Sequence, residues 1–535
     1  MSLLRVKDLS LSIGPTPILD RVSLEAGRGE ILGIVGESGS GKSLTALSIL
    51  NLLPRHSRLS GSVIFDDIKL TRLSDRALND VRGDDIGMIF QEPMTALNPV
   101  KTIGAQVAET VLVHGKAGRG EAMAIARQTL DRVGLGAEEF PLSRYPHELS
   151  GGQRQRVGIA MAIALRPRLL IADEPTTALD VTNQAQVLDL LKDLVREDGM
   201  GLILITHDLA VVAEMADTVA VLKAGRVVES GPVRDVFRQM RDPYTRKLFS
   251  ASAHVPARKA QQSARTLLEV EGLVRTYPKP KPAPWAPRAF KVALDGVSLS
   301  VAQGESVGLV GESGSGKSTL ARAVLGLETA QAGEIAINGA PVRGPGDTAF
   351  ATRRAMQMVF QDPYGSFNPR HTVERLVAEP LHLLGTEAPS GAERRRRIDT
   401  VLTQVGLLPA DANKFIHEFS GGQRQRIAIA RALIVEPSLI VLDEAVSALD
   451  VSIRAQILDL LAAISERIGV AYLFISHDLH VVRAVTDRVY VLKDGKVVES
   501  GATSEVFERP RHDYTRALIA AAPRLDAALK TRFGE

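Results

Sequence analysis

The chain has no cysteine among its 535 residues. This absence excludes disulfides, thiolate catalysis, and zinc or iron–sulfur centres that cysteine would hold. Long hydrophobic runs are also lacking, since no stretch approaches the roughly 18 apolar residues of a membrane-spanning helix. Residues 1–13 alternate between polar and apolar like a β-strand, without the apolar core of a signal peptide. We therefore expect a cytoplasmic protein that reaches a membrane only by docking onto it.

Net charge is small as well, at +3 for the whole chain, and this gives no case for nucleic-acid binding. The remaining composition, 45% hydrophobic and 24% charged, is typical of a soluble globular protein. Each half of a chain of this length can bury a substantial core.

A glycine-rich stretch stands between two apolar segments near the N-terminus. The run before it, 31–35, is typical of a buried strand, and the one after it, 44–50, of a helix. In this context the pattern GxxxxGK[ST] predicts a phosphate-binding loop, because backbone N–H groups and the helix start converge on an anion. Lys42 would reach the outer phosphates, and the Ser43 hydroxyl would bind Mg²⁺. The loop consists of Gly36, Glu37, Ser38, Gly39, Ser40, Gly41, Lys42 and Ser43.

The same pattern returns in the second half of the chain, which removes the alternative of a chance match. This second loop consists of Gly311, Glu312, Ser313, Gly314, Ser315, Gly316, Lys317 and Ser318. Other landmarks recur at a constant offset of 270, as Gln91 and Gln361 do (361 − 91), whereas the loops are 275 apart (311 − 36). Constant spacing indicates a duplicated domain. We expect a first domain over 1–250, a polar linker over 251–266 and a second domain over 267–535.

Two neighbouring carboxylates end an apolar run in each half of the chain. They are Asp173 and Glu174 in the first half, and Asp443 and Glu444 in the second. We expect the run to form a strand beside the phosphate-loop strand in a parallel sheet, so that both acids emerge at the ligand end. The aspartate would then hold Mg²⁺, and the glutamate would orient or deprotonate the attacking water. The alternative, a structural ion pair, is weakened by the repeat.

A histidine and a glutamine also follow apolar strands in each half. His207 and His477 stand just past a buried strand. A lone histidine in such a place is usually structural, but beside a phosphate loop it can donate a hydrogen bond to the terminal phosphate. Gln91 and Gln361 end other apolar strands and carry an amide that can reach water and Mg²⁺.

Each half contains a second helix start of the anion-binding kind. A serine that is a good N-cap precedes two glycines and a credible helix. One ATP does not need two helix N-termini from the same domain, so we expect each of these starts to serve the neighbouring domain's ATP. The residues are Ser150, Gly151, Gly152 and Gln153 in the first half, and Ser420, Gly421, Gly422 and Gln423 in the second.

Together these motifs resemble the nucleotide-binding subunit of an ATP-binding cassette (ABC) transporter, with two cassettes in one chain. The resemblance covers nearly the whole sequence and includes D-loop segments at 178–180 and 448–450. It implies an α/β fold of two P-loop NTPase domains, each with a parallel-sheet core, an antiparallel β subdomain and a helical subdomain. The implied cofactors are ATP and Mg²⁺. The implied arrangement is head-to-tail, with ATP on the Lys42 loop covered by residues 420–423 and ATP on the Lys317 loop covered by residues 150–153.

Two further segments narrow the solute class. Residues 91–99 and 361–369 are similar to the QDP…LNP segment of oligopeptide, dipeptide and nickel importer ATPases, and residues 242–246 and 512–516 resemble that group's C-terminal HPYT tail. The resemblance implies import of peptides, glutathione or a related solute, with nickel or another non-peptide solute as the alternative. The implied partners are two membrane permease subunits, which would dock near the two glutamines, and an extracytoplasmic solute-binding protein.

Two other classes of function are disfavoured. A soluble twin-cassette ATPase acting on ribosomes or DNA would carry a long charged helical insert between the cassettes, whereas the linker here is short and the charge is near balance. Export is disfavoured by the LNP segments (residues 91–99 and 361–369) and by the YTR segments (residues 242–246 and 512–516).

The chain departs from the family pattern at a few positions. The aromatic residue that stacks on adenine would be Tyr277 in the second cassette, whereas Ile13 at the matching position of the first offers only apolar contact. We therefore expect the first cassette to bind nucleotide more weakly. Phe419 precedes the second serine-glycine-glycine motif, where the family's LSGGQ signature begins with leucine. Ala445 replaces the proline seen at Pro175.

Overall fold

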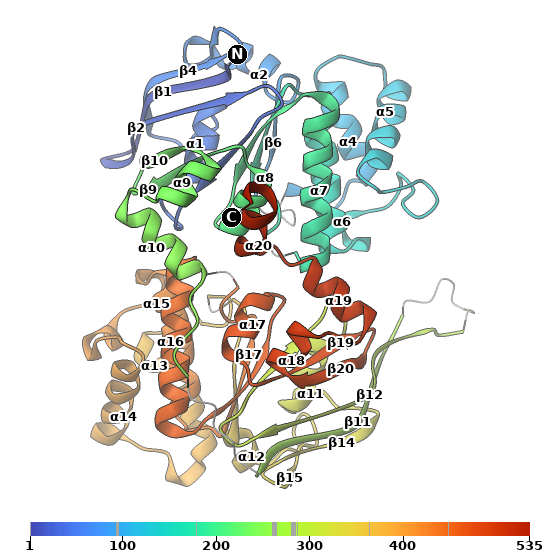
Figure 1. The fold of residues 1–535 in the computed structure, drawn as a ribbon. Helices are drawn as coiled ribbons and strands as arrows, with labels where there is room; N and C mark the ends of the chain where they lie inside the picture. The colour runs from blue at the N-terminus through green and yellow to red at the C-terminus, as the bar shows by residue number, and fades with distance from the viewer. Residues whose placement is uncertain are drawn as a thin grey trace. The chain divides into compact units, whose positions relative to one another are not determined.

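The computed structural model describes residues 2–91, 96–177, 179–258, 265–279, 285, 287–362, 364–447 and 449–534. The chain forms two compact units, which are coloured along the chain in Figure 1. Unit 1 comprises Met1–Ala253 with Pro523–Glu535, and unit 2 comprises His254–Ala522. Parts of the predicted LNP, D-loop and linker segments lie outside the described residues, namely 92–95, 178, 259–264, 363 and 448.

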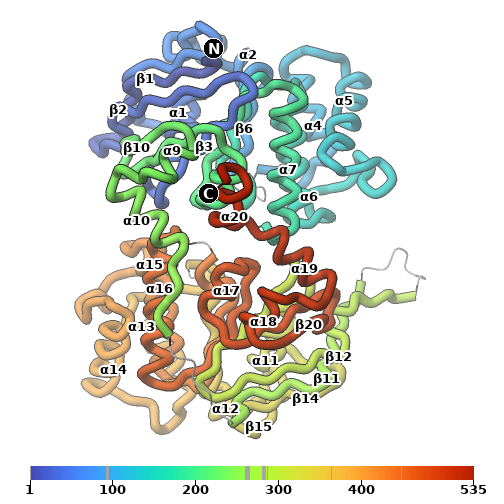
Figure 2. Tube along the Cα trace, in the orientation of Figure 1, coloured from blue at the N-terminus to red at the C-terminus, as the bar shows by residue number. Residues whose placement is uncertain are grey.

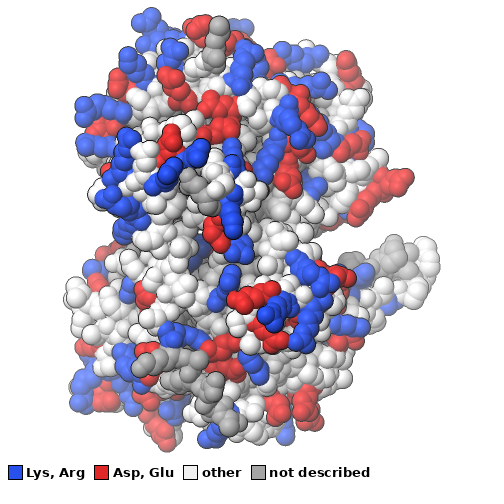
Figure 3. All heavy atoms as spheres, viewed as in Figure 1, with Lys and Arg blue, Asp and Glu red and all other residues white. Residues whose placement is uncertain are grey.

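Two general expectations can be compared with the described part of the chain. None of its helices is both long and apolar enough to cross a bilayer. Acidic and basic side chains are interspersed over the face drawn in Figure 3, in keeping with the small net charge.

Unit 1 begins with an antiparallel four-stranded sheet in the order β2-β1-β4-β5. Apolar residues alternate along its central strand, so that Leu9 and Leu11 face the core while their neighbours face outward. The strands are β1 (Ser2–Ile13), β2 (Thr16–Gly27), β4 (Ser57–Phe65) and β5 (Ile68–Lys69).

The second sheet of unit 1 has six strands in the order β10-β9-β3-β8-β7-β6. Neighbouring strands are parallel except β10, which runs antiparallel to β9. The three central strands β3, β8 and β7 are buried at every position, as expected of a parallel sheet covered on both faces. The strands are β3 (Ile31–Val35), β6 (Ile86–Ile89), β7 (Leu169–Asp173), β8 (Gly201–Ile205), β9 (Thr218–Lys223) and β10 (Arg226–Pro232).

Successive side chains of β3 belong to different cores because they point to opposite faces of the sheet. Leu32 and Ile34 pack with the antiparallel sheet and α1, and Ile31 and Val35 pack with α4, α6 and α7. The helices of unit 1 are α1 (Lys42–Ile49), α2 (Asp75–Val81), α4 (Ile103–Val113), α5 (Arg119–Arg132), α6 (Gly151–Ile163), α7 (Val181–Asp198), α8 (Leu209–Met215), α9 (Val233–Gln239) and α10 (Pro243–Ser252).

The C-terminal helix α20 (Leu525–Phe533) also belongs to unit 1 and lies beside α8 (Figure 2). Its Leu529 and Phe533 pack against the core of the unit. Arg532 donates to the Asp217 carboxylate at 2.8 Å and to the carbonyl oxygen of Ala213 at 3.3 Å. A cation near the end of α8 interacts favourably with the carbonyl groups there.

Unit 2 has the same architecture. Its antiparallel sheet has the order β12-β11-β14-β15, and its six-stranded sheet has the order β16-β17-β18-β13-β19-β20, parallel except for β20. The strands are β11 (Thr266–Pro278), β12 (Phe290–Ala302), β13 (Ser306–Val310), β14 (Ala332–Ile337), β15 (Ala340–Pro341), β16 (Met356–Val359), β17 (Leu439–Asp443), β18 (Ala471–Ile475), β19 (Arg488–Lys493) and β20 (Lys496–Ala502). The predicted α/β fold, with a parallel core and an antiparallel β subdomain in each unit, is confirmed.

The helical region of unit 2 is less regular than that of unit 1. Where unit 1 has the 11-residue α4, unit 2 has the five-residue α13, followed by a 3₁₀ segment over Glu379–Glu387. Pro380 lacks the N–H that would continue the α-helix. The helices of unit 2 are α11 (Lys317–Val324), α12 (Phe350–Ala355), α13 (Val373–Val377), α14 (Gly391–Gln404), α15 (Gly421–Leu433), α16 (Val451–Ile468), α17 (Leu479–Val485), α18 (Thr503–Glu508) and α19 (Asp513–Ala520).

One expectation about the strand order is wrong. The strand that ends in Asp173 was predicted to lie beside the phosphate-loop strand, but β8 stands between β7 and β3, and β18 stands between β17 and β13 in unit 2. The inserted strand is the one that leads to the histidine. Because every strand from β3 to β7 is parallel, the acids still emerge at the same edge as the loop.

Gly225, in the turn between β9 and β10, offers a test of how closely this turn packs against β2. Its φ is +76°, and a Cβ atom there would lie 2.0 Å from the carbonyl oxygen of Ile18. Gly29 has a similar φ of +63° with nothing within 4 Å of such an atom. We predict that Gly225→Ala destabilises unit 1 by about 2–4 kcal/mol, from backbone strain plus overpacking. Gly29→Ala, which has only the strain, should cost about 1 kcal/mol.

Calorimetric unfolding of the full chain would measure both changes. Equal shifts of the transition temperature for the two variants would contradict the close approach of Gly225 to β2.

Candidate active site

In unit 1 the glycine-rich loop joins the end of β3 to the start of α1. Gly41 is the N-cap of α1 with φ 101°. A Cβ atom on Gly36 would lie 2.2 Å from the carbonyl oxygen of Leu222, so only glycine fits there. The Lys42 ammonium donates to the carbonyl oxygens of Gly36 at 2.8 Å and Glu37 at 3.0 Å. The loop is therefore wrapped around the lysine predicted to bind phosphate.

The loop of unit 2 has the same geometry. Gly316 caps α11 with φ 112°, and the Lys317 ammonium donates to the carbonyl oxygens of Gly311 at 2.7 Å and Glu312 at 2.8 Å. In each loop the middle serine, Ser40 or Ser315, has a buried hydroxyl without a hydrogen-bond partner among the described residues. Because buried polar groups are normally satisfied, an orphaned hydroxyl in a glycine-rich loop fits a site that receives an anion.

The predicted glutamate, glutamine and histidine come together in unit 1. Glu174 accepts a hydrogen bond from the Gln91 amide at 3.1 Å and from the Thr177 hydroxyl at 2.8 Å. Its other carboxylate oxygen lies 3.4 Å from Nδ1 of His207. These side chains come from four separate segments, at the ends of β6, β7 and β8 and in the loop after β7. Thr177 was not predicted, since it belongs to no recognised motif.

Unit 2 repeats this cluster, with the Gln361 amide 2.6 Å from a Glu444 oxygen and Nδ1 of His477 3.1 Å from the other. Both glutamates have left-handed backbone angles, with φ of 46° for Glu174 and 49° for Glu444. A non-glycine residue in this region costs about 1–3 kcal/mol and persists only where the surrounding structure enforces it. Such strain concentrates at functional sites, and here it occurs at both predicted catalytic carboxylates.

The two neighbouring acids of unit 1 differ in pKa. Burial raises the pKa of the Asp173 carboxyl to about 6, and the charge of Glu174 adds to the rise, against the hydrogen bond from Ser43. Burial also acts to raise the pKa of Glu174, but the hydrogen bond and charge of His207 outweigh it and lower that pKa to about 2. Glu174 is therefore ionised at neutral pH, as a group that orients or deprotonates water must be.

The same directions hold in unit 2. Burial raises the pKa of Asp443, whereas for Glu444 the effect of burial is outweighed by His477, and the pKa is lowered. The pKa of His477 is raised, because the hydrogen bond and charge of Glu444 exceed the effect of burial.

The donor set at the loop suits Mg²⁺. The Ser43 hydroxyl donates to Asp173 Oδ1 at 3.1 Å, so a hydroxyl and a carboxylate already lie together. Both are hard oxygen ligands, and Mg²⁺ usually takes only one or two protein ligands with waters and substrate phosphates. One hydroxyl and one carboxylate thus fit an ion that nucleotide phosphates and water complete.

The serine-glycine-glycine turns begin α6 and α15. Ser150 Oγ accepts from the Gln153 N–H at 3.3 Å, while Gln153 Oε1 accepts from the Ser150 N–H at 2.9 Å. Ser420 and Gln423 form the same reciprocal capping box at 3.4 Å and 3.0 Å. The predicted helix starts are therefore present and exposed; which phosphate each one faces stays a prediction.

Tyr277 is held from one side by charged neighbours. The Arg275 guanidinium lies 4.8 Å above its ring, and its hydroxyl donates to Glu328. In unit 1 a cavity of about 440 Å³ opens beside the β1–β2 hairpin, next to Ile18 and Leu19. None of the described residues that line this cavity is aromatic.

Sequence reasoning missed a second contact to each phosphate loop. The Glu37 N–H donates to the hydroxyl of Tyr244 at 3.0 Å, and the Glu312 N–H to the hydroxyl of Tyr514 at 2.9 Å. Both tyrosines belong to the YTR segments. Those segments gave a signal, but nothing in the local sequence indicates that they contact a loop 207 or 202 residues away.

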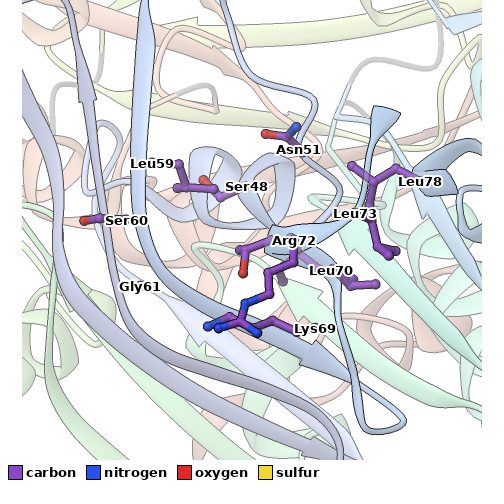
Figure 4. A pocket seen from close by; sticks show the side chains of 12 residues that line it. Ser48, Asn51, Leu59, Ser60, Gly61, Lys69, Leu70, Arg72, Leu73 and Leu78 are labelled. Atoms are coloured by element: carbon purple, nitrogen blue, oxygen red, sulfur yellow. The ribbon is translucent and has the colours of Figure 1, made fainter. Parts of the chain in front are cut away.

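A further cavity of unit 1, of about 270 Å³, contains none of the predicted site residues (Figure 4). Its lining comes from the end of α1, from β4, from β5 and the segment after it, and from α2, and includes Ser48, Gly61 and Lys69. The candidate active site thus consists of the loop, the Gln–Glu–His cluster and the aspartate in each unit.

A P-loop beside a parallel sheet, with these carboxylates and a capped serine-glycine-glycine helix start, defines an ATP-binding cassette. Residues 19–177 and 294–447 match the ABC transporter family, and residues 228–282 and 498–534 match the oligopeptide/dipeptide transporter C-terminal region. The chain belongs to the ABC transporter family, and the predicted resemblance is confirmed.

Similar proteins span nearly the whole chain. The peptidoglycan transport ATP-binding protein YejF of Agrobacterium fabrum is 46% identical over 98% of this chain and 97% of its own length. The glutathione import ATP-binding protein GsiA of Escherichia coli K12 is 47% identical over 94% of this chain and 86% of its own length. Among solved structures, cbiO1 of Clostridium perfringens is 26% identical over 50% of this chain and 96% of its own, with a TM-score of 0.41.

The contrast between Tyr277 and Ile13 generates a prediction. Tyr277→Ala should weaken ATP binding to the second cassette by about threefold to tenfold, because stacking on the ring is lost. Tyr277→Phe removes the bond to Glu328 but keeps the ring, and should bind nearly as the parent does. Titration of the full chain with a fluorescent ATP analogue would measure both.

Ile13→Tyr is the complementary change and should raise affinity at the first site. If Tyr277→Ala left the tighter of two binding phases unchanged, Tyr277 would not be the residue that contacts the base.

Proposed function

We propose that this chain hydrolyses ATP to drive import of a small peptide-like solute, such as a di- or oligopeptide or glutathione, through an ABC importer. The observation that carries the proposal is the cluster of Glu174, Gln91 and His207 beside the Lys42 loop, which recurs in unit 2. Two cassettes, over 1–250 and 267–535 with a linker at 251–266, would each provide one loop.

The chain's own residues divide the work in each cassette. Lys42 and Lys317 bind the outer phosphates, and Ser43 and Ser318 hold Mg²⁺ with Asp173 and Asp443. Bound Mg²⁺ would neutralise developing charge on the phosphates. Glu174 and Glu444 orient or deprotonate the attacking water. His207 and His477 donate to the terminal phosphate, and Gln91 and Gln361 orient the water and the ion.

The helix starts at Ser150 and Ser420 would complete the site of the opposite cassette. An exposed, capped helix N-terminus attracts an anion, so a γ-phosphate shared by both cassettes would stabilise their closed state. Shifting such an equilibrium from mostly open to mostly closed requires about 5.5 kcal/mol of differential binding free energy. Two ATPs would each supply roughly half, which a few charge-assisted hydrogen bonds can give. Hydrolysis would remove the shared anion and loosen the pair.

The solute class is inferred from the relatives and from the C-terminal region. One relative is named for glutathione import and another for peptidoglycan transport, and both names point to solutes with amide-linked amino acids. The match to the oligopeptide/dipeptide C-terminal region supports the same class. The partners would be two permease subunits at the cytoplasmic face of the membrane and, through them, an extracytoplasmic solute-binding protein.

Neutralising both carboxylates tests the chemistry and the transport together. Glu174→Gln with Glu444→Gln should slow ATP turnover by about 100-fold to 10,000-fold, because the carboxylate at the attacking water is lost. ATP binding should persist. Uptake of labelled di- and tripeptides and glutathione, in cells carrying the variant with its permeases, should stop.

Near-normal turnover in the double variant would refute the assignment of the two glutamates. If the parent chain hydrolysed ATP normally and cells took up nickel but no peptide, nickel would replace the peptide-like solute in the proposal.

Substitution in one signature tests the head-to-tail arrangement. Ser420→Arg blocks the helix start of α15 and should abolish hydrolysis at the ATP held by Lys42, leaving the Lys317 site active. Ser150→Arg is the matched control and should have the opposite effect. Trapping of labelled nucleotide, followed by peptide mapping of each loop, would identify the impaired site, and impairment in the same cassette as the substitution would overturn the arrangement.

A further inference from the structure

A tyrosine hydroxyl links the YTR segment of each cassette to its own phosphate loop. Tyr244 is the second residue of α10 and is 5% exposed, and Tyr514 is the second residue of α19 and is 8% exposed. Each hydroxyl accepts the N–H of the second loop residue, Glu37 or Glu312, at 3.0 Å and 2.9 Å. The contact is thus made twice, at matching positions of two loops.

The tyrosine itself is held in place by neighbours that have no part in phosphate binding. In unit 1 the N–H of Tyr244 donates to the Asp242 carboxylate at 2.7 Å, and the Lys223 ammonium lies 5.0 Å from the ring centre. Glu229 on β10 accepts the N–H groups of Arg241 at 2.9 Å and Asp242 at 3.1 Å. The start of α10 is therefore pinned to the sheet at several points.

Unit 2 uses the same supports with one change of residue type. His512 Nδ1 replaces the carboxylate and accepts the Tyr514 N–H at 3.1 Å, and Lys493 lies 4.9 Å from the ring centre. Glu499 on β20 accepts the N–H groups of Arg511 at 2.7 Å and His512 at 3.0 Å. A tyrosine that only filled the hydrophobic core would not need these matched contacts at its helix start, nor a hydroxyl that accepts the N–H of one loop residue.

The position of this bond within the loop shows what it can do. The Glu37 carbonyl oxygen accepts from the Lys42 ammonium at 3.0 Å and from the Ser40 N–H at 3.1 Å. Under the proposed function Lys42 turns toward the phosphates when nucleotide binds, and its bond to Glu37 would then be given up. The hydroxyl of Tyr244 does not contact phosphate in this scheme. The hydrogen bond from the Glu37 N–H to the Tyr244 hydroxyl would therefore stay in place when nucleotide binds.

We propose that Tyr244 and Tyr514 are positioning residues for ATP binding, through which the YTR segment presets the phosphate loop of its own cassette. A preset loop binds phosphates without first ordering its backbone, and that ordering would otherwise reduce affinity. The inference rests on the proposed function, since it takes these loops to bind ATP. It assigns a physical role to the C-terminal region, namely to support the loop from behind.

The test removes only the two hydroxyl oxygens. In the full chain, Tyr244→Phe with Tyr514→Phe should raise KM for ATP, and Kd for a non-hydrolysable ATP analogue, by about threefold to tenfold, as expected for one lost hydrogen bond. The value of kcat should change less than twofold. Tyr490→Phe is the matched control, because that hydroxyl also accepts a backbone N–H, from Ser300 at 3.1 Å, but not one in a phosphate loop.

Hydrogen exchange gives a readout that does not depend on turnover. Without nucleotide, the amide of residue 37 and that of residue 312 should exchange faster in the double variant and at the parent's rate in Tyr490→Phe. Unchanged KM, Kd and exchange in the double variant would overturn the inference while leaving ATP hydrolysis by the parent intact. A rise in KM accompanied by an equal fall in thermal stability in both variants would overturn it too. Failure of the parent chain to hydrolyse ATP would instead refute the proposed function.

Discussion

The parallel pairing of β3 with β8, and of β8 with β7, is the constraint on which the candidate site depends. In unit 1, Ile205 of β8 is paired with Ile34 of β3 on one side and with Asp173 of β7 on the other. In unit 2, Ile475 stands in the same way between Leu309 and Asp443. The loop, the acids and the histidine therefore leave the sheet from one row of residues. Segments separated by more than a hundred residues meet because parallel strands share a carboxyl edge.

This edge also explains how two adjacent acids obtain different pKa values. Asp173 is the last residue of β7, and its burial beside the loop raises its pKa, an effect that a bound cation would oppose. Glu174 is turned out of the strand by its left-handed backbone angle and meets His207, which stabilises its ionised form. One peptide unit of strained backbone thus separates a carboxyl suited to bind a metal ion from one suited to act on water.

Local sequence predicted those features that a local pattern specifies. The strand–loop–helix order follows from the apolar runs around residues 36–43, and the capped helix starts follow from the serine-glycine-glycine pattern, and both are present. The order of strands could not be predicted, because it depends on which crossover the chain takes and not on the residues of β7. Tyr244 was likewise recognised only as part of a segment that resembles the family's C-terminal tail. Its bond to Glu37 joins residues 207 apart in the sequence, and no periodicity encodes such a pairing.

The two units share the same cluster of candidate catalytic residues but differ at the position expected to contact the adenine base. The Gln–Glu–His cluster, the strained glutamate and the tyrosine behind the loop are present in both, with Gln–Glu distances of 3.1 and 2.6 Å and tyrosine–loop distances of 3.0 and 2.9 Å. By contrast, Tyr277 with its Arg275 and Glu328 neighbours has no aromatic counterpart in the described part of unit 1, where Ile13 stands instead. Under the proposed function, the contact to adenine would set affinity, whereas the cluster would act on the γ-phosphate. We therefore predict two equivalent sites of chemistry whose occupancy is unequal at limiting ATP.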